Sequence, residues 1–150
     1  MFVTIIKKLF LRDLAKLRTE IELYKNEENL WYTEGDITNS AGNLCLHLVG
    51  NLNAYVGAVL GNTGYVRNRP LEFSSRNVTR ADLLKSIDET IEMMSTTLDQ
   101  LSDEILSREY PQVVAGGTVT TGYFLTHLSS HVMYHLGQIN YHRRLLDKDH

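Results

Sequence analysis

The chain has 150 residues and 43% hydrophobic content, which is the size of one domain and enough to bury a core without disulfide cross-links. Its formal net charge is only −3 and no run of Lys or Arg exceeds a pair, so we expect no nucleic-acid partner. The single cysteine, Cys45, excludes an internal disulfide and agrees with a reducing compartment.

The N-terminal part of the chain predicts an amphipathic helix. Its first residues, MFVTIIKKLF, do not sustain the apolar run that a signal peptide or a membrane span needs. We therefore expect a cytoplasmic protein with no membrane partner. From Ile6 to Tyr24, apolar residues recur in steps of four and three, and charged residues mostly fill the other faces.

A second helix is expected at residues 41–61, AGNLCLHLVGNLNAYVGAVLG, directly after the capping residues Thr38, Asn39 and Ser40. The segment is apolar nearly all round, which indicates deep burial. Residues 61–78 contain turn residues and Pro70 without helical periodicity, so we expect a long crossover loop. Because such a loop can lead to a diagonal or a parallel position, the helix order stays open.

The second half of the chain predicts two more helices. Thr79 with Asp82 resembles a capping box in which Asp takes the place of Glu, and apolar residues then repeat in steps of three and four from Leu84 to Ile105. A glycine-containing loop leads to a fourth helix at residues 121–146. No strand signal competes. The sequence predicts one all-α domain over residues 1–150, a four-helix bundle with a crossover loop between helices two and three.

Histidines in the fourth predicted helix point to a binding site. In HLSSHVMYHLGQI, residues 127–139, His127, His131 and His135 follow at four-residue intervals and share one helix face. A single histidine on an apolar face is usually an ordinary core residue, but a stripe of them needs partners for many ring nitrogens. His47 stands among leucines in the second helix. Neutral imidazoles from two facing helices could converge on one divalent cation.

These histidine segments resemble the DinB/YfiT-like superfamily of metal-dependent proteins, in HLVGNL at 47–52 and in the 127–139 segment. The resemblance covers nearly the whole chain and extends through NSAGNLCLHLVGNL, YVRNRPLEF and YHLGQINYHRRLL. Within the superfamily, the chain is similar to a branch labelled a domain of unknown function. The resemblance implies a four-helix bundle that binds one divalent metal ion through His47, His131 and His135. The same resemblance leaves His127 outside the ligand set, so we expect it either to contact a ligating residue or to lie in the pocket wall.

Amide side chains near the histidines are candidates for accepting the second ring N–H of each ligand. Asn43 and Asn51 lie one turn before and after His47, and Gln138 follows His135. Capping or hydrogen bonding between helices is the alternative for these amides. Cys45 points about 200 degrees away from His47 on a helix, so we expect it only to pack in the core.

Two further expectations concern residues around the site. His142, beside Arg143 and Arg144, is expected to have a solvated or a boundary role near the helix end. Neither histidine-bearing helix places an acidic residue beside its histidines. The Glu-x-x-His pattern of di-iron bundles and the His-Glu-x-x-His pattern of zincin proteases are both missing from the sequence.

Three neutral ligands leave the charge of a divalent ion intact and at least one coordination position open, which is typical of catalytic sites. That position could acidify a water or bind a thiol. Relatives in the superfamily include thiol-dependent isomerases and S-transferases. The resemblance therefore implies a metal-dependent enzyme that transfers a small-molecule thiol to an electrophilic substrate. A metal-dependent hydrolase and a non-catalytic metal-binding stress protein are the alternatives. Zinc, nickel and iron all suit imidazole, so the metal's identity stays open.

The predicted loop also concentrates arginines. Arg67 and Arg69 are expected either to be solvated or paired with Glu72, or to bind the carboxylate of an anionic cosubstrate. The second possibility requires the loop to fold back over the end of the bundle. Trp31 and Tyr32 lie outside the helical stripes and are expected to be exposed aromatics. Because members of the superfamily are also frequently dimers, a homodimer is expected.

Overall fold

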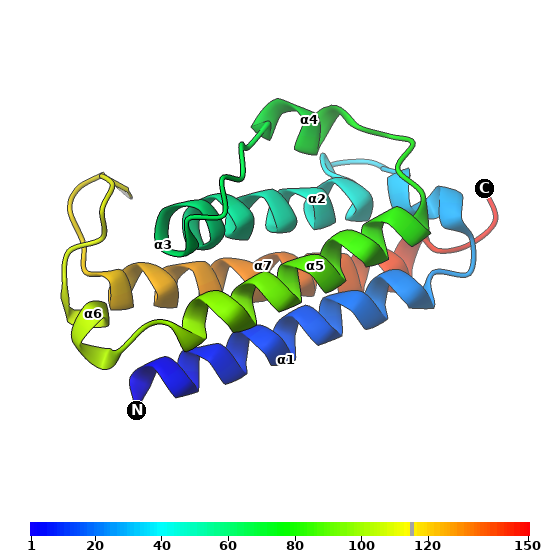
Figure 1. The fold of residues 1–150 in the computed structure, drawn as a ribbon. Coiled ribbons are helices and arrows are strands. Elements are labelled where there is room, and N and C mark those ends of the chain that lie inside the picture. The colour runs from blue at the N-terminus through cyan, green and yellow to red at the C-terminus, as the bar shows by residue number, and fades with distance from the viewer. Residues whose placement is uncertain (115) are drawn as a thin grey trace.

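A computed structural model describes residues 1–114 and 116–150, and it confirms the all-α helical bundle. Long helical segments lie side by side along one direction (Figure 1): α1 (Phe2–Leu23), a continuous segment Ala41–Gly61 that begins with α2 (Ala41–Leu52), α5 (Arg80–Asp99) and α7 (Thr121–Leu146). Shorter helices occupy the connections: η1 (Glu27–Trp31), α4 (Arg69–Ser74) and α6 (Asp103–Ser107).

Side-chain caps set where three of the long helices begin. The hydroxyls of Ser40, Thr79 and Thr120 each accept a hydrogen bond from the backbone N–H three residues on, at 3.1 Å. The predicted range of the fourth helix, 121–146, is confirmed by α7. The third helix was expected to continue to Ile105, but α5 ends at Asp99 because Ser102 caps a separate helix, α6.

The second helix changes its winding partway. After α2, the chain forms the π-helical turn η2 (Asn53–Ala58) and the short α3 (Val59–Gly61), and it ends where Asn62 adopts a left-handed φ of 50°. Length and composition would let this segment cross a membrane, but half of its apolar window is buried inside the bundle. The core helix of a folded bundle has the same properties, so the observation is weak evidence for a span.

Contacts between side chains fix the direction of the helices. Lys7 pairs with Asp99 and Arg18 with Asp88, so α1 and α5 are antiparallel. The Asn53 amide donates to Thr90 Oγ1 at 2.9 Å, and Gly61 lies against Thr97, so the second helix and α5 run parallel.

The connection from residue 62 to 79 therefore returns along the bundle, and it is not a loop throughout. It contains α4, whose first turn includes Pro70 and is capped by Asn68. Proline fits there because the first turn of a helix does not use its N–H. The expectation of irregular structure at Arg69–Ser74 is wrong.

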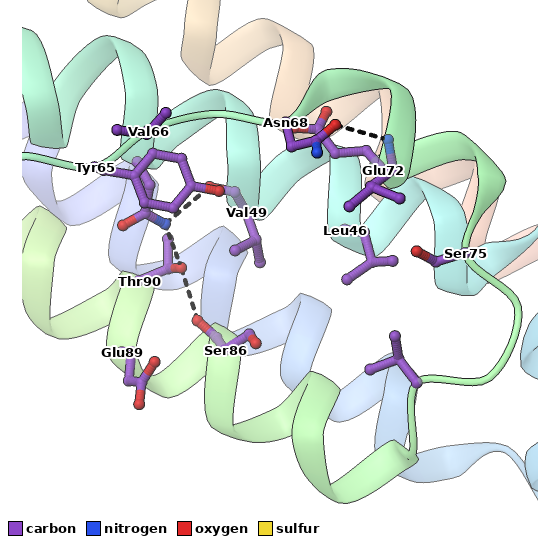
Figure 2. Close-up of a pocket in the computed structure, with 13 residues that line it drawn as sticks. Leu46, Val49, Tyr65, Val66, Asn68, Glu72, Ser75, Ser86, Glu89 and Thr90 are labelled. Carbon is purple, nitrogen blue, oxygen red and sulfur yellow. Dashed lines mark hydrogen bonds between the residues drawn. The ribbon is translucent and has the colours of Figure 1, made fainter.

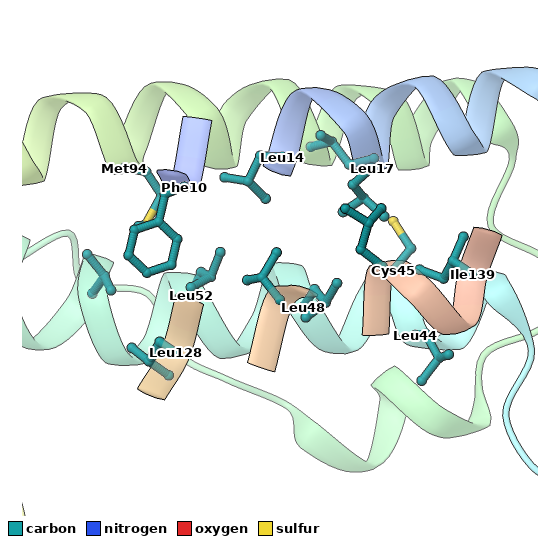
Figure 3. Close-up of a cluster of buried hydrophobic side chains, with 14 of the residues drawn as sticks. Phe10, Leu14, Leu17, Leu44, Cys45, Leu48, Leu52, Met94, Leu128 and Ile139 are labelled. Carbon is teal, nitrogen blue, oxygen red and sulfur yellow. The ribbon is translucent and has the colours of Figure 1, made fainter. Parts of the chain in front are cut away.

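The core lies between the long helices (Figure 3). It is formed by the α1 stripe and by apolar residues of α2, α5 and α7, including Phe10, Leu14, Leu48, Met94 and Ile139. Cys45 is fully buried among them, and burial raises the pKa of its thiol to about 12. A thiol in this environment is inert packing, as predicted. Trp31 is half-buried against Gly42, so it is not the exposed aromatic that the dimer expectation relied on.

Candidate metal centre

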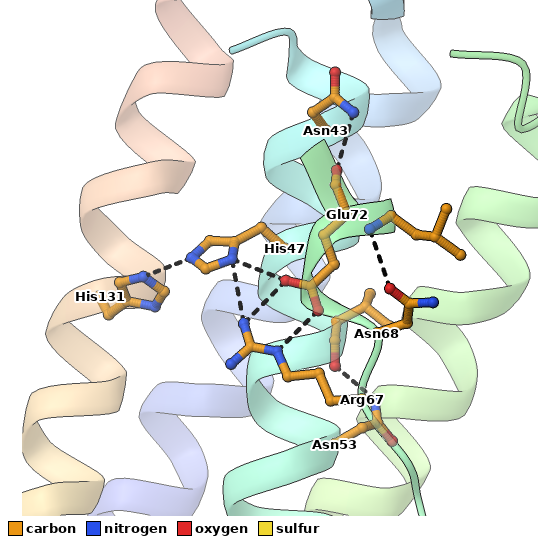
Figure 4. Close-up of polar contacts among 9 residues, drawn as sticks. Asn43, His47, Asn53, Arg67, Asn68, Glu72 and His131 are labelled. Carbon is orange, nitrogen blue, oxygen red and sulfur yellow. Dashed lines mark hydrogen bonds and ion pairs between the residues drawn. The ribbon is translucent and has the colours of Figure 1, made fainter. Parts of the chain in front are cut away.

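Helices α2 and α7 bring three histidines together. His47 comes from α2, and His131 and His135 lie one turn apart on α7. One ring nitrogen from each lies within 4.8 Å of the other two. Figure 4 shows His47 and His131 facing each other across the two helices, with their Nε2 atoms 3.1 Å apart. Two nitrogens bound to one tetrahedral metal at about 2.0–2.1 Å would be about 3.3 Å apart.

Burial favours the neutral form of two of these imidazoles. Loss of solvation is the largest cause that lowers the pKa of His131, and together with the neighbouring His135 and His47 it brings that pKa to about 4. Burial also lowers the pKa of His47, against the opposing effect of a hydrogen bond to Glu72. Neutral imidazole is the form that binds a metal ion, so the two rings are in the ligating state at neutral pH.

Oxygen acceptors orient two of the three rings. His47 Nδ1 lies 3.0 Å from Glu72 Oε1, and His135 Nδ1 lies 2.6 Å from Gln138 Oε1. Because a carboxylate only accepts hydrogen bonds, Nδ1 of His47 carries the proton and its Nε2 keeps the lone pair. The same arrangement at His135 leaves its Nε2 free. The donor set therefore fits one divalent cation, and it does not select between zinc, nickel and iron.

Glu72 was not expected at the site, because neither histidine-bearing helix carries an acidic residue there. It comes from α4 and is only 6% exposed. Arg67 donates to both of its oxygens, from Nε and from Nη2, at 2.9 Å each. Arg67 Nη2 also lies 3.3 Å from His47 Nδ1. Both nitrogens donate to Glu72 Oε1, and the negative charge of that oxygen offsets the repulsion between the two donors. The buried carboxylate is thus neutralised by Arg67 while it orients His47.

Two residues of α2 allow α4 to lie this close. A Cβ atom on Gly50 would be 1.9 Å from Glu72 Oε2, so only glycine leaves room for the carboxylate. The Asn43 amide donates to the backbone oxygens of Glu72 and Ser75, at 2.9 and 2.8 Å. Asn43 therefore attaches α4 to α2 and does not contact His47. A glycine buried inside a helix, one turn after a histidine, was the sequence signal for this contact.

A cavity of about 530 Å³ lies beside His47 and His131, and most of the other candidate residues line it. Its wall includes Asn51, Arg67, Arg69 and His127, together with Tyr55, Val113, Phe124 and Leu128, and no acidic side chain of the described residues. His127 is exposed, and its ring stacks on Phe124 at 5.9 Å.

The two arginines differ in their surroundings. Arg67 is committed to Glu72, whereas the Arg69 guanidinium lies 5.2 Å from the centre of the Phe73 ring, which in turn packs on His47 at 4.9 Å. The loop does fold back to the site, as cosubstrate binding by Arg67 or Arg69 requires.

Two further cavities border the site, one lined by His135 and the other by Glu72. Gln138 and His135 line a cavity of about 490 Å³ bounded by Tyr134 and Leu44. Another, of about 390 Å³, separates α4 from α5 (Figure 2), and Glu72 forms part of its wall.

His142 is buried, whereas a solvated or a boundary role was expected. It is 4% exposed, its Nδ1 lies 2.7 Å from the Tyr24 hydroxyl, and its Nε2 lies 2.7 Å from the Tyr32 carbonyl oxygen. Both ring nitrogens are therefore satisfied by the segment that follows α1. Its role is to hold that segment against α7, and it takes no part in the metal centre.

Comparisons with known proteins bear on family and fold. Residues 3–150 match a family described as "Protein of unknown function (DUF1572)". The crystal structure of a conserved protein from Enterococcus faecalis is similar over 95% of both chains, with a TM-score of 0.75 and 17% sequence identity. At that identity, the likeness shows the fold alone. No curated protein matches the chain.

Replacing Gly50 by alanine is expected to displace the Glu72 carboxylate, since the new Cβ would overlap Oε2. We expect a loss of about 1–3 kcal/mol in the free energy of unfolding and weaker metal binding, measured by urea unfolding and metal titration. Gly137→Ala is the matched control, because no atom lies within 4 Å of its added Cβ on the exposed face of α7. Equal behaviour of the two variants would contradict this account.

The metal-free protein is expected to lose stability in mild acid. The pKa of His131 is about 4 in the folded state and 6.5 without the surrounding structure. As the pH falls from 6.5 towards 4, His131 therefore binds a proton in the unfolded chain but not in the folded chain, which lowers the free energy of unfolding. Urea unfolding across this range should show a shallower pH dependence for His131→Gln than for the wild type. His150→Gln is the control at an exposed histidine. An unchanged slope in His131→Gln would refute the prediction.

Proposed function

The chain belongs to the DUF1572 family of proteins of unknown function, and we propose that it is a metal-dependent enzyme whose divalent ion is bound by His47, His131 and His135. The observation that carries the proposal is the convergence of three imidazoles on one point beside a cavity, with two rings already oriented by oxygen acceptors. Three protein ligands leave a position open, as in catalytic sites, whereas structural zinc sites are closed by four.

We propose further that the reaction transfers a small-molecule thiol to an electrophile, as the resemblance to the DinB/YfiT-like superfamily implies. When bound, a divalent cation lowers the pKa of a coordinating thiol or water. No carboxylate of the described residues lines the cavity to remove a proton from water, and Glu72 is committed to Arg67 and His47. A thiol, with a pKa of about 8.5, loses its proton far more readily than water does, so it needs no general base at the site. This favours thiol transfer over hydrolysis.

The chain's own residues supply binding and orientation. Glu72 and Gln138 hold the rings of His47 and His135 in direction. Apolar side chains of the cavity wall, Phe124 and Leu128 among them, exclude water from bound substrate.

We assign recognition of an anionic cosubstrate to Arg69. Arg67 already donates two hydrogen bonds to Glu72, so its charge is balanced within the protein. No ion pair of the described residues involves Arg69, and its contact with Phe73 holds the guanidinium at the cavity wall. Two arginines without an acidic residue in the wall make the cavity attractive to carboxylates.

Metal content and turnover test the function. Metal-replete wild-type protein should carry one divalent ion per chain, and His131→Ala should lose it. His127→Ala, one turn away on the same helix face, should keep it. Incubation with a bimane electrophile and a panel of small thiols should give turnover that requires both metal and thiol. Thiol-independent ester hydrolysis would instead favour a hydrolase, and retained metal without either activity would favour a non-catalytic metal-binding protein. Normal metal content in His131→Ala would refute the site.

Arg69→Gln should raise KM for a carboxylate-bearing thiol by roughly ten- to hundredfold, because a hydrogen bond between two charged groups is lost. Metal content should stay unchanged. Arg144→Gln is the matched control, since Arg144 also lies over an aromatic ring, that of Tyr141 at 5.5 Å, outside the cavity. The assignment fails if both variants keep the wild-type KM, or if Arg69→Gln affects a neutral thiol equally.

A further inference from the structure

Two buried polar atoms near the metal centre have no hydrogen-bond partner in the structure. They are His131 Nδ1 and Asn51 Oδ1, and among the described residues only Arg80 Nε shares this condition. When Nε2 of His131 keeps its lone pair, its Nδ1 is a donor, whereas the amide oxygen of Asn51 is an acceptor. A buried polar atom without a partner costs free energy. In this tautomer, a hydrogen bond from His131 Nδ1–H to Asn51 Oδ1 would satisfy both atoms.

The helix directions place Asn51 about one helical turn from His131, at the level of His127 and Leu128 on α7. His47 of α2 faces His131 of α7, and Tyr55 further along packs on Phe124 at 5.1 Å, so the two helices are antiparallel. Asn51 lies one turn after His47, on the stretch of α2 between these two contacts. Asn51 and His131 both line the 530 Å³ cavity. Asn51 is 7% exposed, so its amide is enclosed in that wall.

The other two histidines show what is incomplete at His131. Nδ1 of His47 has an oxygen acceptor in Glu72, and Nδ1 of His135 has one in Gln138. Metal-ligating histidines generally donate their second ring N–H in this way, which fixes the tautomer and the direction of the ring. His131 alone of the three lacks an acceptor.

We propose that Asn51 is this acceptor: its side chain turns so that Oδ1 accepts the Nδ1–H of His131 when a divalent ion occupies the site. The inference rests on the proposed metal site. Asn51 is then a positioning residue that acts on the metal through His131, and all three histidines bind through Nε2. The three acceptors are two neutral amides and a carboxylate already paired with Arg67, so they orient the rings without adding uncompensated negative charge near the ion.

Zinc titration of the purified full chain tests the role of Asn51. Asn51→Leu keeps the approximate volume but removes the acceptor, and its zinc affinity should fall roughly ten- to hundredfold. Asn51→Asp restores an acceptor and should bind zinc at least as tightly as the wild type. Asn53→Leu is the matched control on the same helix, because the Asn53 amide donates to Val49 O and Thr90 Oγ1 instead. It should lower stability and leave zinc affinity unchanged.

Long-range ¹H–¹⁵N spectra of the zinc-loaded protein give a second readout that a merely structural role would not affect. The wild type should show Nε2 coordination at His131 and a slowly exchanging Nδ1–H, and Asn51→Leu should lose that slow exchange. Zinc affinity of Asn51→Leu within twofold of the wild type, or coordination of His131 through Nδ1, would overturn the inference. A wild type that binds no zinc would overturn the metal site itself, and this inference with it.

Discussion

A buried carboxylate shared between a guanidinium and an imidazole is the interaction on which the rest of the site depends. Placing Glu72 in the protein interior would be costly without compensation, and Arg67 supplies it by donating to both oxygens. The same carboxylate orients His47, which makes α4 part of the candidate metal centre although it carries none of the three histidines. The space at Gly50 and the amide of Asn43 then follow as requirements, because α4 must lie against α2 for the carboxylate to reach the ring.

Helical periodicity in the sequence predicts the long helices and the faces that their residues share, but it does not predict contacts between residues far apart in the chain. The α1 stripe, the limits of α7 and the shared face of His131 and His135 follow from helical spacing, and the resemblance pairs these two with His47. The helix α4 has too few residues to show a periodic pattern, so Arg69–Ser74 was expected as loop. For the same reason Glu72 was considered only as a partner for loop arginines. The burial of His142 depends on Tyr24, far away in the chain, and no local pattern records it.

The site combines neutral ligands with a wall that lacks acidic residues, and these two properties work in the same direction. Imidazoles whose pKa values are lowered by burial give a metal ion no charge to offset its own. The Glu72 carboxylate beside His47 is balanced by Arg67, so its negative charge does not reach the cavity uncompensated. Such a site would keep most of the electrostatic pull of a bound cation available to a substrate. The three-histidine set is therefore suited to activating a weak acid, while the arginines favour an anionic one.

The parallel arrangement of α2 and α5 has a consequence for the order in which the chain matures during synthesis. The connection that returns along the bundle already brings Glu72 and Arg67 to His47, so these three residues can meet once α4 has left the ribosome. His131 and His135 lie on α7, the last long helix to be synthesised. The three-histidine set therefore cannot form until α7 has been synthesised. If the site binds a metal ion as proposed, its complete set of ligands arises only when α7 packs against α2.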